Sequence, residues 1–248
     1  ALFFSGSARF RDEYDRLFTS VFSNPESMKS IVNHLYTRRS GYTRKELSTL
    51  SGLPTGGALT AALKALEGSD FIEKYVPFGL GKRDSHYKLV DPFCLFYLHF
   101  VADMPKADEQ FWTHNQSTQA VITWRGLTFE NICFRHIAQI KQALGISGVR
   151  SSQSQWIVHG KEKNTQIDLL IDRDDHVLNA CEVKFYSNPF TVDKQYYQEL
   201  LGRQEILMQM LSPKTALYQT LISAYGLKRN EYSSIFTQVV TMDDLFNH

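Results

Sequence analysis

The sequence predicts an α/β protein in two parts: a helix-rich amino-terminal part, and a carboxy-terminal part with the element order αβββαβ. Three observations support this prediction. Short segments between residues 7 and 69 carry apolar residues at helical spacing and are separated by Gly, Pro and Ser. The runs FIEKYVPF and SHYKLV follow as two strands joined by the turn-rich GLGKRD. From Trp124 a helical pattern leads into three strand-like runs, a second long helix and further strands.

Length and charge set the limits of this organisation. The chain has 248 residues, enough for one large domain or two small ones. With 27 Lys and Arg against 26 Asp and Glu, the net charge of +1 gives no overall bias toward nucleic acid or a membrane. Residues 25–95 have ten basic and seven acidic residues, whereas residues 120–248 have thirteen of each. We therefore expect a mildly basic first domain over 1–103, a polar linker over 104–119 and a second domain over 120–248.

The cysteines and the chain start indicate the compartment. Cys94, Cys133 and Cys181 are odd in number, far apart and inside apolar runs, which predicts reduced thiols in a cytoplasmic protein rather than disulfides or a zinc site. No apolar run approaches the roughly 18 residues of a membrane span, and ALFFSGSARF lacks the features of a signal peptide. The first residue is not Met, which is expected of a piece of a longer protein and equally of a processed chain.

The first domain is predicted element by element. Residues 7–22 and 28–39 each place apolar residues on one helical face. Thr43 and Glu46 have capping-box spacing and open a short helix that ends at Gly52, and Pro54 begins a third helix through ALTAALKALEGS. Three such helices followed by a hairpin are typical of a winged helix-turn-helix domain. The aromatic run DPFCLFYLHFVADM is interpreted as a buried helix rather than a cofactor site.

A winged helix places its third helix in the major groove and its wing cations on phosphates. The third helix here presents mainly Thr and Gly and only one cation, whereas the wing has several basic side chains. Phosphate contact or protein docking is therefore at least as well supported as reading of a DNA sequence. The predicted nucleic-acid contacts are Lys64 on the helix and, on the wing, Lys82, Arg83 and Lys88, with His86 beside them.

The stretch QIDLLIDRDDHVLNACEVKFY, residues 166–186, has the composition of a metal site on a hairpin. Side chains two apart in a strand share a face, so Glu182 and Lys184 point the same way. A turn at residues 173–176 pairs positions whose numbers sum to about 349, which brings Asp168 near Cys181 or Glu182. Opposed carboxylates destabilise a sheet unless a cation is bound. Mg²⁺ or Mn²⁺ would take one or two such carboxylates and activate a water for phosphodiester hydrolysis, with Lys184 placed to stabilise charge.

A plainer interpretation of this hairpin is also open. The acidic residues at its tip are ordinary turn formers, and the Glu-x-Lys would then be a solvated face. Against it, the residues around Glu182 are apolar, as expected of a covered central strand. His159 and His176 flank the strands and are interpreted as polar edge residues, and no nucleophile-elbow pattern is present.

Asp168, thirteen residues, and then Glu182-Val183-Lys184, within the order αβββαβ, resemble the PD-(D/E)XK nuclease superfamily, whose fold is that of restriction endonucleases. The resemblance implies that Asp168 and Glu182 are metal ligands and that Lys184 is the catalytic lysine. It also implies that Glu130, in GLTFENI on the preceding helix, is an accessory ligand or holds the water. The sequence departs from the pattern in having Ile167 where the family has proline.

Nearly the whole chain, with EYDRLF, the winged helix, YKLVDPFCLFYLHFV and GLTFENICFRHI, resembles the carboxy-terminal two-thirds of a family of archaeal and bacterial P-loop ATPases of the AAA/STAND type. The resemblance implies an upstream ATP-binding domain in the same polypeptide as a partner. No G-x-x-x-x-G-K-[ST] occurs here, so ATP hydrolysis is not expected of this chain.

Two hypotheses of function follow. The first is a Mg²⁺- or Mn²⁺-dependent nuclease, with DNA the expected substrate, controlled by the ATPase. The second is a catalytically silent scaffold that binds nucleic acid or protein and regulates the ATPase. A transcription regulator is a weaker third hypothesis because the recognition helix is poor, and self-association is left open.

Overall fold

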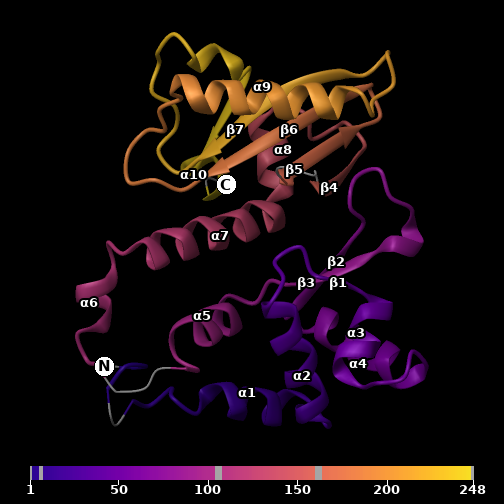
Figure 1. Cartoon of the computed structure of the whole chain (residues 1–248), viewed down its shortest axis with the longest axis vertical. Coiled ribbons are helices and arrows are strands. Elements are labelled where there is room, and N and C mark those ends of the chain that lie inside the picture. Colours follow the sequence, from indigo (N-terminus) through magenta and orange to yellow (C-terminus); the bar gives the residue numbers. More distant parts are fainter. Residues whose placement is uncertain (1, 6–7, 104–107, 160–163, 247–248) are drawn as a thin grey trace. The chain divides into compact units, whose positions relative to one another are not determined.

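The structure is a computed structural model that describes residues 2–5, 8–103, 108–159 and 164–246 of the chain (Figure 1). The fold is mixed α/β and separates into two compact units. The first consists of residues 1–76 and 81–121, and the second of residues 77–80 and 122–248. Within the described residues, no helix is both long enough and apolar enough to cross a membrane.

The first unit packs its helices around one core and a small antiparallel sheet with strand order β1-β3-β2. The segment between β2 and β3 contains a short 3₁₀ turn at Lys82–Asp84. Every helix and strand predicted for the winged-helix region is present, and β1 is an additional short strand. The elements are α1 (Glu13–Val21), α2 (Pro25–Tyr36), β1 (Tyr42–Thr43), α3 (Arg44–Ser51), α4 (Gly57–Gly68), β2 (Ile72–Tyr75), β3 (His86–Leu89), α5 (Pro92–Phe100) and α6 (Phe111–Asn115).

Local signals explain the boundaries in this unit. The predicted capping box is present at α3, where the Thr43 N–H donates to Glu46 Oε2 at 2.7 Å, and the Glu46 N–H donates to Thr43 Oγ1 at 3.3 Å. Gly52 ends α3 in the left-handed region with φ 71°. Gly41 has φ +68°, and a Cβ there would lie 1.9 Å from the Tyr87 carbonyl oxygen, so only glycine fits this turn.

Two expectations for residues 91–121 need correction. The aromatic helix α5 is not buried all round, because only Cys94 and Phe100 among its residues are buried. Several of its rings instead form a partly exposed aromatic cluster with the chain start, in which Phe3 lies 5.0 Å from Phe96. The predicted linker contains α6, and α7 begins inside it at Gln119. Residues 104–107 lie outside the described residues.

The second unit contains a mixed five-stranded sheet of order β4-β5-β6-β7-β8. Strands β4, β5 and β6 pair antiparallel, whereas β6, β7 and β8 pair parallel. The predicted single helix over 124–144 is divided at His136 into two helices. The elements are α7 (Gln119–Arg135), α8 (Ile137–Ala143), β4 (Ser151–His159), β5 (Asn164–Arg173), β6 (Val177–Lys184), α9 (Lys194–Met208), β7 (Ala216–Ser223), β8 (Gln238–Thr241) and α10 (Met242–Phe246).

Strand β6 is the centre of this sheet and is buried from Leu178 to Val183. Helix α9 covers one face, where Leu207 joins a cluster with Trp156 and Leu170. On the other side Phe129 of α7 packs against Phe185 at 5.4 Å between ring centroids. The prediction of a covered central strand is therefore confirmed. Cys94, Cys133 and Cys181 are all free and buried.

Candidate functional site

A cavity of about 500 Å³ in the second unit is lined by the four residues that the sequence singled out for chemistry. Glu130 comes from α7, Asp168 from β5, and Glu182 and Lys184 from β6. The remaining wall includes side chains of α9 that the sequence did not single out, among them Tyr196 and Arg203. Four residues from three separate elements of the chain thus line one space.

The strand register explains how Asp168 and Glu182 come together. Strand β5 pairs with β6 through Leu169 opposite Cys181, so paired residue numbers sum to 350, one from the predicted 349. Asp168 and Glu182 lie immediately beyond this last pair. The Val183 N–H donates to Asp168 Oδ2 at 3.4 Å, which ties the Asp168 side chain to β6.

Asp168 has few partners for its charge. Besides Val183, the carboxyl accepts a hydrogen bond from Gln166 Nε2 at 3.1 Å, and within the described residues it makes no ion pair. Burial of the carboxyl group, followed by the nearby charges of Glu130 and Glu182, raises the pKa of Asp168 well above its usual range. The Asp168 carboxylate is therefore under-compensated beside two other acids.

Glu182 has the opposite surroundings. Its side chain is 5% exposed, and Lys184 Nζ lies 2.6 Å from Oε1 while Arg203 Nη1 lies 2.8 Å from Oε2. The Tyr196 hydroxyl also donates to Oε1. Arg203 Nη1 donates in addition to the Gln166 carbonyl at 3.1 Å, so the guanidinium links β5, β6 and α9. This burial corrects the interpretation of Glu182 as part of a solvated face.

The donors around Glu182 keep their protons. Burial alone would lower the pKa of Lys184, but the neighbouring Glu182 and Tyr196 raise it above its ordinary value. Burial and then Glu182 raise the pKa of the Tyr196 hydroxyl. Lys184 is therefore a fixed positive charge near neutral pH, and Tyr196 is a hydrogen-bond donor, so neither is suited to act as a general base there.

Tyr196 and Arg203 were not singled out from the sequence as site residues. A signal exists, because residues 196, 200, 203 and 207 follow helical spacing and lie on one face of α9. Leu200 and Leu207 on this face are buried. The signal lies in the polar members of that stripe, Tyr196 and Arg203, because a buried polar side chain in an apolar stripe needs a partner.

The donor set suits a hard divalent cation. Glu130, Asp168 and Glu182 supply only oxygen ligands, and the poorly compensated Asp168 would be stabilised by a cation. Within the part of the chain that the structure describes, no three His, Cys, Asp or Glu side chains are close enough together to hold one ion. The fit is thus to a cation that keeps several waters and takes one or two of these carboxylates, as Mg²⁺ commonly does.

The predicted nucleic-acid contacts of the first unit divide into two groups. Lys64 on α4 and Lys82 and Arg83 in the 3₁₀ turn are exposed and can reach a ligand. The prediction for Lys88 is wrong, because its side chain is 1% exposed. Its Nζ lies 3.8 Å from Glu73 Oε2 and stands over the Tyr75 ring. A lysine enclosed in this way does not present its ammonium to a phosphate.

His176 does not line the candidate site. His176 is exposed in the turn between β5 and β6 and has φ 63°, consistent with its interpretation as an edge residue. The side chain of His159 lies outside the described residues.

Comparison of the sequence with protein-family models gives no match, and a search of curated proteins finds no similar one.

Proposed function

We propose that the second unit is a metal-dependent nuclease of the PD-(D/E)XK type that hydrolyses phosphodiesters, with DNA as the expected substrate. The observation that carries the proposal is the convergence of Glu130, Asp168, Glu182 and Lys184 on one cavity. The order of elements supports it too, because a helix carrying an acid precedes the strands, and β6 with Glu182 and Lys184 is central in the sheet.

Each residue has a role that its surroundings support. Mg²⁺ or Mn²⁺, when bound, would lower the pKa of a water and neutralise charge on the phosphate. Asp168 and Glu182 would hold the ion, and Glu130 would hold it or orient the water. Lys184 would stabilise the charge that develops on the phosphate oxygens, since its ammonium is fixed beside the carboxylates. Tyr196 and Arg203 would act through Glu182 by fixing the position of its two oxygens.

The first unit is proposed to be a winged helix that assists this activity. Three helices, α2 to α4, and a three-stranded sheet support the fold assignment. Exposed Lys64, Lys82 and Arg83 would contact backbone phosphates, which adds affinity without sequence preference. Control by an upstream ATPase domain remains part of the proposal and depends on the resemblance alone.

A second candidate function is a silent scaffold with the same fold. The observation in its favour is that Glu182 already has Lys184, Arg203 and Tyr196 as partners. A carboxylate satisfied by protein donors needs no metal, so a chain that has lost catalysis could keep this arrangement.

The test is cleavage of plasmid, linear, branched and single-stranded DNA, and of RNA, with Mn²⁺ or Mg²⁺. The wild-type chain is compared with Asp168→Ala and Lys184→Ala, each checked for folding by circular dichroism. We expect both variants to lose at least about 100-fold in rate, the usual effect of removing one group that stabilises a transition state. Asp174→Ala, at an exposed turn position, is the matched control and should cleave like the wild type.

Metal-dependent cutting that is lost in both folded variants would establish the nuclease. Cutting that survives in both variants would show that the cavity is not its source. If neither this chain nor a longer protein carrying an ATPase domain cleaves any substrate, the scaffold becomes the better proposal.

A further inference from the structure

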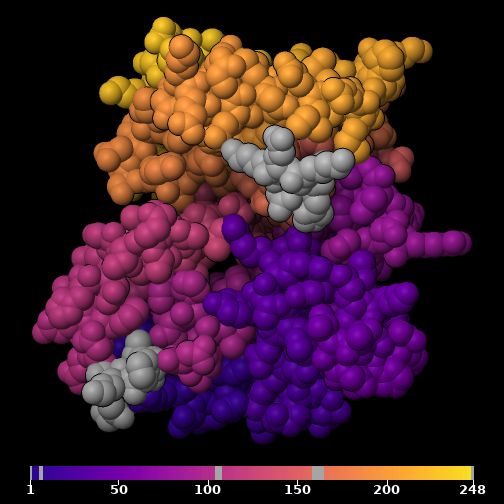
Figure 2. Space-filling model, in the orientation of Figure 1, coloured from indigo at the N-terminus to yellow at the C-terminus, as the bar shows by residue number. Residues whose placement is uncertain are grey.

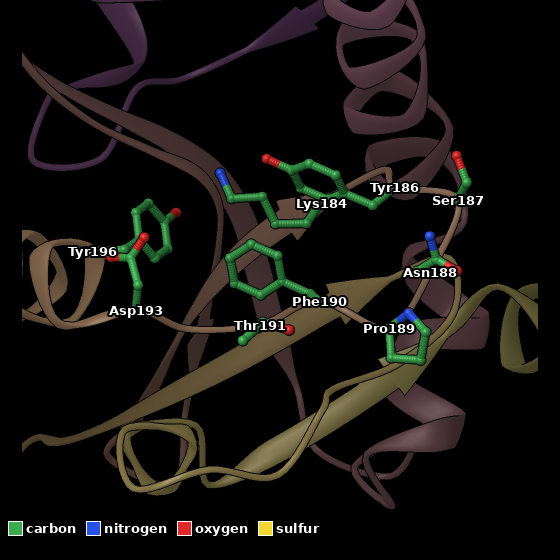
Figure 3. Close-up of a pocket in the computed structure, with 9 residues that line it drawn as sticks. All are labelled: Lys184, Tyr186, Ser187, Asn188, Pro189, Phe190, Thr191, Asp193 and Tyr196. Carbon is green, nitrogen blue, oxygen red and sulfur yellow. Dashed lines mark hydrogen bonds between the residues drawn. The ribbon is translucent and has the colours of Figure 1, made fainter.

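A second cavity, of about 450 Å³, adjoins the candidate site and shares Lys184 and Tyr196 with it. It lies where β6 ends and the chain runs through residues 185–193 toward α9 (Figure 3). We propose that this cavity holds one unpaired nucleobase of the strand whose phosphate lies at Lys184. The inference rests on the proposed function and adds a substrate class to it, namely strands with an unstacked base.

An aromatic platform carries the argument. The rings of Tyr186 and Phe190 are stacked, with centroids 5.6 Å apart and an interplanar angle of 28°. Tyr196 stands edge-on to Phe190, at 5.6 Å and 81°. Phe190 is 8% exposed, whereas Tyr186 is 49% exposed. Tyr186 is thus supported by a buried ring and still offers surface to a ligand, which is the arrangement that proteins use to stack bases regardless of sequence.

The platform is held in place by backbone hydrogen bonds from a distant segment. The Phe190 N–H donates to the Gly226 carbonyl at 2.8 Å, and the Lys228 N–H donates to the Phe190 carbonyl at 2.8 Å. These bonds attach the segment before α9 to the chain that follows β7. A platform fixed before binding loses little conformational entropy when a base arrives, which favours affinity.

Polar groups at the rim match the edges of a base. Ser187, Asn188 and Thr191 line the cavity and are exposed, and their side chains make no hydrogen bond within the described part of the chain. An amide such as Asn188 can both donate and accept, as the edges of bases do. Figure 3 shows Phe190 between the Ser187–Pro189 segment and Tyr196. Asp193 differs, because it already caps α9 by accepting from the Tyr196 N–H at 2.7 Å.

The shared lysine indicates which nucleotide of the strand would place its base in the second cavity. Because Lys184 lines both cavities, a phosphate bound at its ammonium would place the base of the same nucleotide next to the cavity that Tyr186 lines. In a duplex, base pairing occupies the Watson–Crick edge and stacking occupies both faces, so a duplex must first release the base. We therefore expect single strands, or bases at ends and junctions, to bind through this platform and intact duplex not to use it.

The experiment measures binding of fluorescently labelled single strands by anisotropy, without divalent metal, so that cleavage does not enter. The full chain is compared with Tyr186→Ala, Tyr186→Phe and Tyr225→Ala, the last being a control at another exposed tyrosine. We expect Tyr186→Ala to weaken binding about tenfold, within the range for losing one stacked base, while Tyr186→Phe and Tyr225→Ala bind like the wild type. Strands of DNA and RNA with the same sequence show which sugar is accepted.

A scan with one abasic position moved along the strand locates the base. For the wild type, one position should weaken binding strongly, and in Tyr186→Ala that position should lose its effect. The proposal is overturned if Tyr186→Ala binds single strands as the wild type does, if the abasic penalty persists in that variant, or if the folded chain binds no single strand.

Cleavage assays keep the two proposals apart. If cleavage depends on Asp168 but Tyr186→Ala binds single strands like the wild type, the nuclease proposal stands and the base site is wrong. If the chain binds single strands through Tyr186 but cleaves no substrate, the base site stands and the nuclease proposal is wrong.

Discussion

Each unit places a lysine beside a glutamate on its sheet, and the two pairs differ in what surrounds them. Lys88 and Glu73 face each other across β3 and β2, with Nζ and Oε2 3.8 Å apart, and the Lys88 side chain is 1% exposed. Lys184 and Glu182 are two residues apart on β6, with Nζ and Oε1 2.6 Å apart, and the Lys184 side chain is 23% exposed. The first lysine is enclosed, whereas the second borders a cavity.

The comparison shows that a lysine and a glutamate on a strand do not by themselves mark a functional site. What distinguishes the second pair is its neighbours. Lys184 and Arg203 are two cations in a cavity that is also lined by four acids, Glu130, Asp168, Glu182 and Glu199. Both cations pair with Glu182, and within the described residues Asp168 makes no ion pair, so an added metal ion would compensate a charge in the second unit.

The largest expected effect separates the two lysines by function. Lys184→Met keeps the stem of the side chain but removes the charge, and we expect metal-dependent cleavage to fall by about 10²–10³-fold, as when one group stabilising a transition state is lost. Lys88→Met makes the same change in the first unit and should leave cleavage of short single strands unchanged. Initial rates at saturating metal measure both. An equal loss in the two variants would mean that the lysines do not differ in role.

A smaller effect is expected on stability when the carboxylate between the two cations is removed. Glu182→Ala leaves Lys184 and Arg203 facing each other without their shared partner. Breaking a buried ion pair costs 3–5 kcal/mol, and because these cations keep partial exposure we expect a loss of about 2 kcal/mol in the free energy of unfolding. Urea denaturation measures it.

The matched control for Glu182→Ala is Glu205→Ala, at an exposed position of α9, which should change stability by less than about 0.5 kcal/mol. If the two variants unfold at the same urea concentration, water already compensates the two cations, and the burial of Glu182 does not set the second pair apart.

The parts of the site that the sequence predicted depend on local rules. The register of β5 and β6 follows from the turn at 173–176 and the two-residue alternation of strands, so the meeting of Asp168 and Glu182 was predictable to within one residue. The burial of Lys88 was not, because its ammonium is enclosed by Glu73 and the Tyr75 ring of β2, and the pattern of a strand does not specify how such side chains pack.

The parts that the sequence missed depend on tertiary packing. Arg203 and Tyr196 join the site only because one face of α9 lies against β6, and a helical pattern does not say which strand it will meet. The second cavity depends on the bridge between Phe190 and Leu227, two residues far apart in sequence. The division of the predicted helix at His136 has no signal, since neither Gly nor Pro stands there.

The smallest effect concerns Asp168, which makes no ion pair within the described residues. Because folding raises its pKa, a protonated Asp168 contributes stability that is complete below the ordinary aspartate pKa and is lost as the pH rises through the folded value. At neutral pH without metal, Asp168→Asn removes the cost of an ionised carboxylate beside Glu130 and Glu182. We expect a gain of about 1 kcal/mol, the low end of the cost of a poorly solvated polar group.

Melting curves from pH 4 to 8, with and without Mn²⁺, test whether Asp168→Asn stabilises the fold as expected. The gain from Asp168→Asn should grow as the pH rises, and Mn²⁺ should raise the melting temperature of the wild type but not of the variant, since a ligand that binds only the folded chain stabilises it. Asp175→Asn should show the opposite pH trend, because its hydrogen bonds from Arg173 lower the pKa of that exposed aspartate. If Mn²⁺ stabilises the wild type and Asp168→Asn equally, the ion binds elsewhere, and the unmatched acid no longer distinguishes the second pair from the first.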